Sequence, residues 1–398
     1  MKVEIHILQN LPPANLNRND TGQPKDCEFG GIRRARISSQ CLKRSIRTSD
    51  AFHSHLQDRI AIRTKRSAEP LAKRLVEQHG HDPETAKPLA EAVVGSMLGW
   101  DEAKGQTKVL FYVGYGELDR LAELIHGQAE DLTETLHALR ELPEDSAKKD
   151  REAAEKAFSN AVGEAVKRFK NEQKDHVRAV DIALFGRMLA EAPDLNIDAA
   201  CQVAHAISTN KVDMDFDYFT AVDDLNPDEE TGAGMIGTTG FNSSCFYRYA
   251  LIDADQLAEN LGGDRGLAAE GIRAFLAASY QAIPTGKQNS FAAQTPPSLF
   301  MVVVKSNRAM PWSLANAFAA PVRPSSDRGL IEAFVQALDE QWDELSDMYG
   351  TDSMKVFLKV GKRAGTVEHL ASHQVENVPA VIEKTAEALL AWVGGNGA

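Results

Sequence analysis

The hydrophobic pattern of the chain switches between strand-like and helix-like stretches. Residues 2–9 alternate between apolar and polar side chains, and residues 243–252 and 299–305 are also strand-like. The run at 299–305 is almost wholly apolar and is the clearest buried strand predicted in the chain. Residues 10–31 contain several prolines and glycines and are expected to form a loop.

Helical spacing of apolar residues dominates the rest of the chain. Helices are predicted from 39 to the mid-fifties and over 67–79, 83–98, 117–141, 147–172, 177–191, 197–209, 264–282, 312–319, 327–348 and 376–393. Two β-rich stretches interrupt them, an extended segment at 60–66 and a short strand within Lys108–Tyr115. The block from about 67 to 192 therefore reads as a helical insertion.

Residues 210–242 differ from their surroundings in composition. Acids crowd the first part, and a glycine-rich run, Gly232 to Gly237, follows them. We expect a β-hairpin arm with a mobile tip. The order of strand, helix, long insertion, strand, helix and strand predicts an α+β fold around a split β-α-β unit of the ferredoxin-like kind.

Composition places the chain among ordinary globular proteins. It has 398 residues, 43% of them hydrophobic and 25% charged, which suits two or three domain-sized units or one fold with large insertions. No apolar run reaches the length of a membrane span, and the N-terminus lacks the layout of a signal peptide, so we expect a cytoplasmic protein. The four cysteines form no Cys-x-x-Cys pair, which argues against a disulfide framework or a structural zinc site.

The most informative stretch runs from Phe29 to Arg47. A Gly-Gly turn at 30–31 is followed by three arginines at 33, 34 and 36, and then by Ser38 and Ser39, which are good N-cap residues for a basic helix. A helix start offers free backbone N–H groups to a phosphate, and arginine forks bind phosphates in bidentate fashion. The pattern therefore favours contact with a polyanion.

Local charge supports this interpretation. Residues 18–47 contain eight Lys or Arg and three acids, a local charge of +5, whereas the whole chain carries −13. A solvated basic face on an amphipathic helix is the ordinary alternative. A concentrated positive site on an acidic chain instead indicates a specific polyanion contact.

Signals for catalysis or metal binding are weak, and we expect no catalytic residue, cofactor or metal. The chain has no His-Glu-x-x-His, P-loop or nucleophile-elbow motif, and the acids at 213–230 lack the spacing of a calcium loop. Met188 follows Gly186 and Arg187; a methionine there is usually a core residue, but an exposed one could wedge between bases.

Short segments in a fixed order, spread over nearly the whole chain, resemble one known family. They are Leu-Asn-Arg-Asn-Asp at 16–20, Lys25-Asp26, Phe-Gly-Gly at 29–31, Arg-Ile-Ser-Ser-Gln at 36–40, Leu-Lys-Arg at 42–44, Asp-Ile-Ala-Leu at 181–184, Gly-Arg-Met at 186–188, Ala-His-Ala-Ile at 204–207, Phe-Thr-Ala-Val-Asp-Asp-Leu at 219–225, Phe-Tyr-Arg-Tyr-Ala at 246–250 and Ala-Asn-Ala-Phe at 315–318. Each is weakly specific alone, but together they are very specific. The chain in these segments resembles the CasC family, the repeated, CRISPR RNA-binding backbone subunit of the type I-E CRISPR Cascade complex.

The resemblance implies a hand-shaped α+β fold with an RRM-like (ferredoxin-like) palm, a large helical fingers insertion and a thumb β-hairpin. It places the first part of the palm with the basic helix at 1–59, the fingers at 60–180, the palm–thumb base at 181–209, the thumb at 210–242 and the second part of the palm at 243–398. It also implies a non-catalytic subunit that binds CRISPR RNA, stacks head to tail with copies of itself along the spacer and presents the guide to target DNA. The implied partners are CRISPR RNA, target DNA and the large, small, Cas5-like and Cas6-like Cascade subunits, with no membrane.

The family's binding residues map onto this sequence one by one. The implied RNA contacts are Arg18, Lys25, Arg33, Arg34, Arg36, Ser38, Gln40, Lys43, Arg44 and Arg47, with Met188 as a base wedge and Ile236 at the thumb tip. The implied DNA contacts are Lys148, Lys149 and Arg151, or alternatively Lys167, Arg168 and Lys170. The family has a lysine after Phe-Gly-Gly where this chain has Ile32, and Arg33 is the expected substitute.

Two rival functions remain open from the sequence. Asp20 lies in the loop where related type III backbone subunits carry an acidic residue that cleaves target RNA, so an RNA endonuclease is one alternative. A free-standing single-strand binder of the RRM type is the other, although its usual aromatic stacking pair is not visible in residues 1–9.

Overall fold

The computed structural model describes residues 1–143, 146–173, 177–221 and 235–394, and the chain folds as two compact units. The first unit contains Met1–His55, Cys201–Asp255 and Ile272–Ala398, and the second contains Leu56–Ala200 and Gln256–Gly271.

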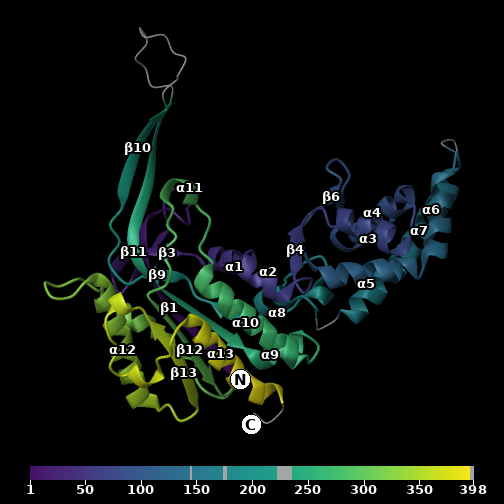
Figure 1. Ribbon diagram of the computed structural model, residues 1–398. Helices are drawn as coiled ribbons and strands as arrows, with labels where there is room; N and C mark the ends of the chain where they lie inside the picture. The colour runs from purple at the N-terminus through teal and green to yellow at the C-terminus, as the bar shows by residue number, and fades with distance from the viewer. Residues whose placement is uncertain (144–145, 174–176, 222–234, 395–398) are drawn as a thin grey trace, which may run out of the picture. The chain divides into compact units, whose positions relative to one another are not determined.

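A large antiparallel sheet organises the first unit (Figure 1). Within the described residues its strands run in the order β13-β12-β1-β11-β9-β3-β2, with β8 and β10 also paired to β11. Their bounds are β1 Lys2–Ala14, β2 Asp26–Phe29, β3 Ile32–Ile37, β8 Cys201–Val203, β9 Ala206–Ser208, β10 Asp215–Ala221, β11 Met235–Asp253, β12 Leu299–Lys305 and β13 Met354–Val360. The predicted α+β class is confirmed.

Helices cover both faces of this sheet. Helices that lie wholly within the first unit are α1 Ser39–Arg47, α11 Gln288–Phe291, α12 Leu330–Tyr349 and α13 Val378–Val393. Three others, α2 Asp50–Leu56, α9 Ala254–Asn260 and α10 Arg265–Gln281, begin or end in the second unit. Short 3₁₀ turns lie at Leu314–Phe318 (η2), Lys362–Ala364 (η3) and Ala371–His373 (η4).

The strand β12, which lies between β13 and β1, shows why both faces are covered. Every residue from Leu299 to Lys305 is buried. Leu299, Met301 and Val303 belong to one core cluster with residues of α12. Phe300, one position out of phase, makes an edge contact with Tyr280 of α10. The predicted buried strand is confirmed. Because side chains alternate across a strand, the structure adds that both of its faces are covered.

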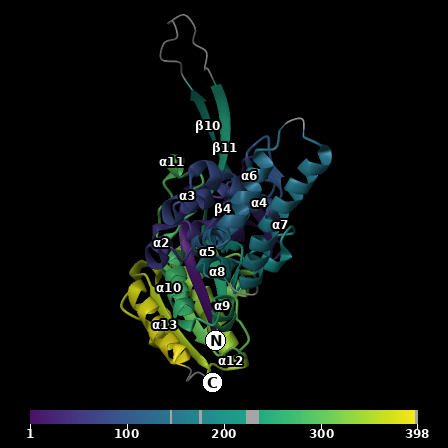
Figure 2. The ribbon, with the colours of Figure 1, turned by 90° about the vertical axis from the view of Figure 1, so that its right-hand side faces the viewer.

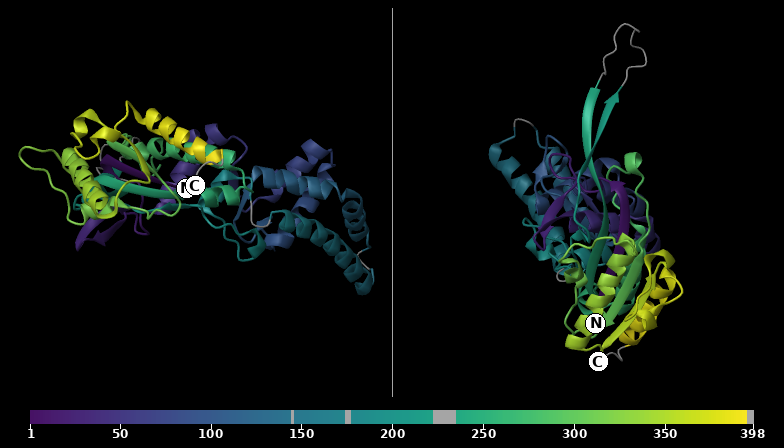
Figure 3. Two further views of the ribbon diagram at one scale, coloured as in Figure 1. Left: turned by 90° about the horizontal axis from the view of Figure 1, so that it is seen from below. Right: turned by 90° about the vertical axis from the view of Figure 1, so that its left-hand side faces the viewer.

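The strands β10 and β11 continue beyond the sheet as a two-stranded arm (Figure 3, right). Their antiparallel register pairs Asp215 with Phe241 and Tyr218 with Thr238. The predicted hairpin pairing is therefore present in the described residues. The glycine-rich tip expected to be mobile lies mostly outside them.

The second unit is mainly helical (Figure 2). Its elements are β4 Ala61–Thr64, α3 Ala68–His79, α4 Pro83–Leu98, β5 Trp100–Asp101, β6 Gln106–Thr107, β7 Phe111–Gly114, α5 Tyr115–His126, α6 Ala129–Arg140, α7 Lys148–Glu172, α8 Val180–Phe185 and η1 Pro193–Leu195. Buried leucines and valines of α3 to α7 form one core, in which Leu71, Leu89, Leu121 and Phe169 are each 0% exposed. The amphipathic patterns of these helices converge on that core.

Several sequence predictions are corrected by the structure. The expected helix at 197–209 is instead β8 and β9, because both segments pair with the backbone of β11. The expected helix at 177–191 stops at Phe185, where Gly186 takes φ +80°. The expected loop at 10–31 contains the end of β1 and all of β2, and β13 was not predicted.

Two expected long helices are each divided in two. The helix predicted from 39 to the mid-fifties ends at Arg47, and α2 begins at Asp50. The helix predicted at 117–141 is split into α5 and α6 around Gly127 and Gln128.

Candidate nucleic-acid interface

The Gly-Gly turn joins β2 to β3 in a tight hairpin. Gly30 and Gly31 have φ of +60° and +72°, and Phe29 pairs directly with Ile32 across the turn. A β-carbon on Gly30 would lie 1.9 Å from the carbonyl oxygen of Ala319. Only glycine fits there, because both the backbone conformation and the close approach exclude a side chain.

The strand after the turn alternates exposed and buried arginines. The Arg33 side chain is 70% exposed and pairs with Asp26, with 2.6 Å between Nη2 and Oδ2. Arg36 is half-buried; its Nε donates to the Asp26 carbonyl at 3.1 Å, and its Nη1 lies 3.0 Å from Nδ1 of His205. Both side chains can reach an external anion.

Arg34 was predicted to bind RNA, but its side chain is buried, with 0% of the residue exposed. Its guanidinium donates to the carbonyl oxygens of Ser208, Thr209, Phe318 and Ala319 at 2.8–3.1 Å. Burial lowers the pKa of Arg34 from its usual value. The side chain therefore holds the hairpin against two other segments of the unit rather than facing a ligand.

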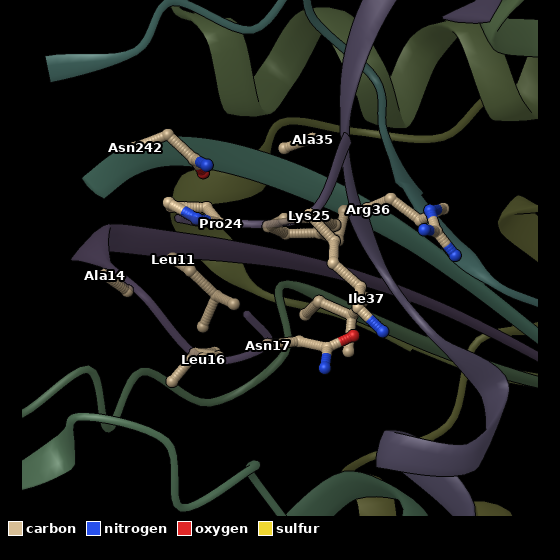
Figure 4. Close-up of a pocket in the computed structure, with 11 residues that line it drawn as sticks. Leu11, Ala14, Leu16, Asn17, Pro24, Lys25, Ala35, Arg36, Ile37 and Asn242 are labelled. Atoms are coloured by element: carbon tan, nitrogen blue, oxygen red, sulfur yellow. The ribbon is translucent and has the colours of Figure 1, made fainter. Parts of the chain in front are cut away.

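A shallow pocket lies beside the hairpin (Figure 4). Figure 4 shows Asn17, Lys25 and Arg36 around it, together with the apolar side chains of Leu11 and Leu16. Two backbone hydrogen bonds fix the spacing of the polar residues: the Lys25 N–H donates to the Asn17 carbonyl at 2.8 Å, and the Arg36 N–H donates to the Lys25 carbonyl at 2.9 Å. These bonds hold Lys25 of the loop and Arg36 of the strand close together.

His205 is a neighbour of this site that sequence reasoning did not select. It lies between β8 and β9, where a helix had been predicted. Burial lowers the pKa of His205, and the positive charges of Arg36 and Lys25 lower it further. A neutral imidazole beside Arg36 can accept its hydrogen bond, so His205 orients that arginine.

The basic helix α1 begins where the sequence predicts. Ser38 is its N-cap, and its hydroxyl accepts from the Cys41 N–H at 3.4 Å. Asn17 Oδ1 accepts from the Ser38 N–H at 2.8 Å, which ties the preceding loop to the helix start. Leu42 and Ile46 form the buried face of the helix.

The remaining predicted residues of the first unit lie on the other faces of these elements. Gln40 and Arg44 are exposed, Lys43 and Arg47 are half-buried, and Arg18 is exposed on the loop. We call the set Arg18, Lys25, Arg33, Arg36, Lys43, Arg44 and Arg47 the basic edge. The loop, hairpin and helix that carry it follow one another in sequence and are hydrogen-bonded to one another.

Met188, which belongs to the second unit, is exposed and not part of a core. Its side chain is 89% exposed, although Arg187 before it and Leu189 after it are buried. Arg187 exchanges two backbone hydrogen bonds of 2.9 Å with Ile197, and the Leu189 N–H donates to Asn196 Oδ1 at 2.6 Å. Hydrogen bonds on both sides of Met188 therefore fix the backbone that carries this exposed apolar side chain.

The other predicted contacts differ in what the structure describes. Lys148, Lys149 and Arg151 are exposed in the first turn of α7, and Lys148 is 3.7 Å from Glu152. The alternatives Lys167 and Arg168 are exposed on the same helix, and Lys170 is half-buried. The backbone of Ile236 lies in β11, but its side chain falls outside the described part of the chain.

The arm carries exposed aromatic residues near its base. Phe216 and Tyr218 are 65% and 61% exposed. Phe216 lies opposite Gly240, whose carbonyl accepts from Asn15 Nδ2 at 2.9 Å. The base of the arm is therefore bonded to the loop that follows β1.

Comparison with known proteins places the chain in a family. The sequence profile of the CT1975-like proteins matches residues 3–386. The chain belongs to the CT1975-like protein family. A solved "CRISPR RNA-guided surveillance complex, pre-nicking" contains a chain that is 31% identical, with a TM-score of 0.78, over 98% of this chain and 100% of that one. A chain of a second "CRISPR RNA-guided surveillance complex" is 27% identical, with a TM-score of 0.67 over 98% of this chain and 100% of that one. No curated protein sequence matches.

Among the described residues of this CT1975-like protein, no group of three or more His, Cys, Asp or Glu could hold a metal ion. Asp20 is exposed on the loop between β1 and β2. No described helix combines the length and the apolarity that a membrane span needs.

Proposed function

We propose that this CT1975-like protein is a CRISPR RNA-binding backbone subunit of a Cascade-type complex, equivalent to CasC of type I-E. Its first unit would serve as an RRM-like palm, its helical unit as fingers and the β10–β11 arm as a thumb. The likeness to a chain of a "CRISPR RNA-guided surveillance complex" over 98% of this chain supports the assignment to a guided complex.

The basic edge is the observation that carries the proposal. Seven cations lie on a loop, a strand and a helix whose relative positions are set by two hydrogen bonds. The Ser38 N–H donates to Asn17 Oδ1, and the Arg36 N–H donates to the Lys25 carbonyl. Cations on segments held together in this way can contact successive phosphates of one RNA strand. Phosphate contacts carry no sequence information, and that is what a guide of variable sequence requires. Base pairing then supplies the specificity.

Assembly follows from repeating this contact along the RNA. Each copy would bind one segment of the spacer, and its arm would meet the next copy head to tail. A contact between two different surfaces propagates as an open helix unless other subunits cap it. Caps would be Cas5-like and Cas6-like subunits, beside a large and a small subunit. Met188 and Ile236 would interrupt the guide between segments, as apolar wedges do in other complexes.

Target DNA would be contacted by cations of the second unit. Lys148, Lys149 and Arg151 are the first candidates, because all three are exposed in one turn of α7. Exposed lysines and arginines attract DNA without regard to sequence.

Replacing Lys43, Arg44 and Arg47 with Ala tests the RNA assignment. Binding should weaken for every guide alike, and the slope of log K against log salt should flatten by about 0.7 per lost phosphate contact. The matched control replaces Lys355, Lys362 and Arg363, which are exposed elsewhere on the first unit and carry the same total charge. If both triple variants lost the same RNA affinity, the effect would be due to net charge alone. If the first variant lost no RNA affinity, the basic edge would not be the RNA-binding site.

We further propose that the subunit is not an enzyme. The assembled complex, incubated with complementary RNA and Mg²⁺, should leave that RNA intact. Cleavage that disappears in Asp20→Asn would establish the endonuclease alternative instead.

A further inference from the structure

The segment between α10 and β12 holds a lysine in a backbone conformation that favours glycine. Lys287 has φ +52° and ψ 21°, and Ala292 has φ +47° and ψ 41°. The two residues bracket the four-residue helix α11. A left-handed conformation costs free energy for any residue with a β-carbon, whereas glycine adopts it readily.

This segment is anchored at several points. A β-carbon on Gly286 would lie 2.3 Å from the Leu16 carbonyl oxygen, so the segment presses directly on the loop after β1. Thr295 Oγ1 donates to the Asn10 carbonyl at 2.6 Å. The ring of Phe291 lies 5.6 Å from that of Phe241 at the base of the arm, beside which Figure 1 shows α11. Lys287 is thus held in place, not displayed on a free loop.

The close approach of Gly286 to Leu16 brings the segment of Lys287 against the loop that carries the basic-edge residue Arg18. Leu16, which Gly286 contacts, immediately precedes Asn17 and Arg18. On another side, residues 281–285 and 294 share an open groove with the residues at the end of α1 and the start of α2. Hydroxyl and amide side chains dominate that groove, which is lined by Ser45, Thr48, Ser49, Asp50, Ala51, Gln281, Ala282, Ile283, Thr285 and Gln294. Such groups bind phosphate and ribose oxygens.

The charge of Lys287 is not paired within the described part of the chain. Its ammonium makes no hydrogen bond or ion pair with any described residue, and the side chain is half-buried. Glycine at this position would relieve the backbone strain and leave the anchoring contacts intact. A ligand for its charge would account for a lysine at this strained position.

We propose that residues 285–290 form a further RNA-binding element in which Lys287 binds a phosphate of single-stranded RNA next to the one held by the loop of Arg18. The groove beside it takes the adjoining sugar-phosphate oxygens. This inference rests on the proposed function of the basic edge and adds to it a contact from the other half of the chain.

Lys287→Gly is the decisive variant, because it removes the charge and relieves the strain together. Its melting temperature should equal or exceed that of the wild type, while RNA binding weakens and the salt slope falls by about 0.7. Ala292→Gly is the matched control: it relieves similar strain without losing charge and should leave RNA binding unchanged. Lys287→Arg should keep the wild-type salt slope.

The outcomes separate this inference from the function on which it rests. A wild-type slope in Lys287→Gly, with a flattened slope in the Lys43, Arg44 and Arg47 triple variant, overturns only the inference. Wild-type salt slopes in both Lys287→Gly and the triple variant would also contradict the proposed function. A lower melting temperature in Lys287→Gly would show that the lysine supports the fold, and that result would also overturn the inference.

Discussion

Arg187 donates from one guanidinium nitrogen to both carboxylate oxygens of Glu117, at 2.9 and 2.8 Å, and both side chains are 1% exposed. The same arginine donates through Nε to the Leu195 carbonyl at 2.7 Å, and Glu117 Oε2 accepts from the Gly114 N–H at 2.7 Å. This buried pair connects the start of α5 to the segment that carries Met188. It explains how a fully exposed methionine can have a fixed backbone.

The first prediction separates Met188 from its support. Met188→Ala should change the free energy of unfolding far less than the roughly 2–5 kcal/mol expected for a buried methionine. Glu117→Gln should destabilise by about 3–5 kcal/mol, because it leaves a buried guanidinium without its charge partner. Chemical denaturation measures both. If Met188 is a wedge, a complex of the Met188→Ala protein with guide RNA should pair more slowly with target DNA, without loss of protein stability. A large loss of stability with normal pairing would contradict this.

The second prediction concerns the neighbours Arg33 and Arg34, which have opposite roles. Arg34→Met should destabilise by about 3–5 kcal/mol, since four buried carbonyl groups lose their donor. Arg33→Ala should stay within about 0.5 kcal/mol of the wild type, because the side chain is exposed. Only Arg33→Ala should flatten the salt slope of RNA binding. A stable Arg34→Met protein with weakened RNA binding would restore Arg34 to the RNA-binding set.

The third prediction concerns the exposed aromatics of the arm. The double variant Phe216→Ser and Tyr218→Ser should melt at the wild-type temperature, because neither ring is part of a core. It should bind short RNA normally but form fewer copies on long RNA. The control is Leu390→Ser, an equally exposed apolar residue on α13. Native mass measurement distinguishes them, and full-length assembly by the double variant would exclude these rings from the contact between copies.

Local chemistry made much of the fold predictable. The run at 299–305 predicts a buried strand from its own composition, because it is short, almost wholly apolar and rich in β-branched residues. The Gly30-Gly31 turn and the Ser38 cap are equally local signals, and both occur where they were predicted. Where a turn or cap residue lies next to the boundary, as at Gly30-Gly31 and Ser38, the predicted position of that boundary was right.

The errors involve information from distant parts of the chain. The pattern of residues 201–208 is compatible with a helix, but the structure shows them as strands hydrogen-bonded to β11. Pairing with a strand that is distant in sequence outweighs their local helical preference. Arg34 cannot be distinguished from Arg33 or Arg36 by residue type. Its role becomes visible only when Phe318 and Ala319, almost three hundred residues away, are seen to accept its hydrogen bonds. The positive φ of Lys287 likewise has no sequence signal.

The most direct test of this account is the mass of the protein bound to single-stranded RNAs of increasing length. The account predicts that the number of bound copies rises in equal steps with RNA length, whatever the RNA sequence, and that the Lys43, Arg44 and Arg47 triple variant loses these steps. A single bound copy at every length, or steps that depend on RNA sequence, would contradict it.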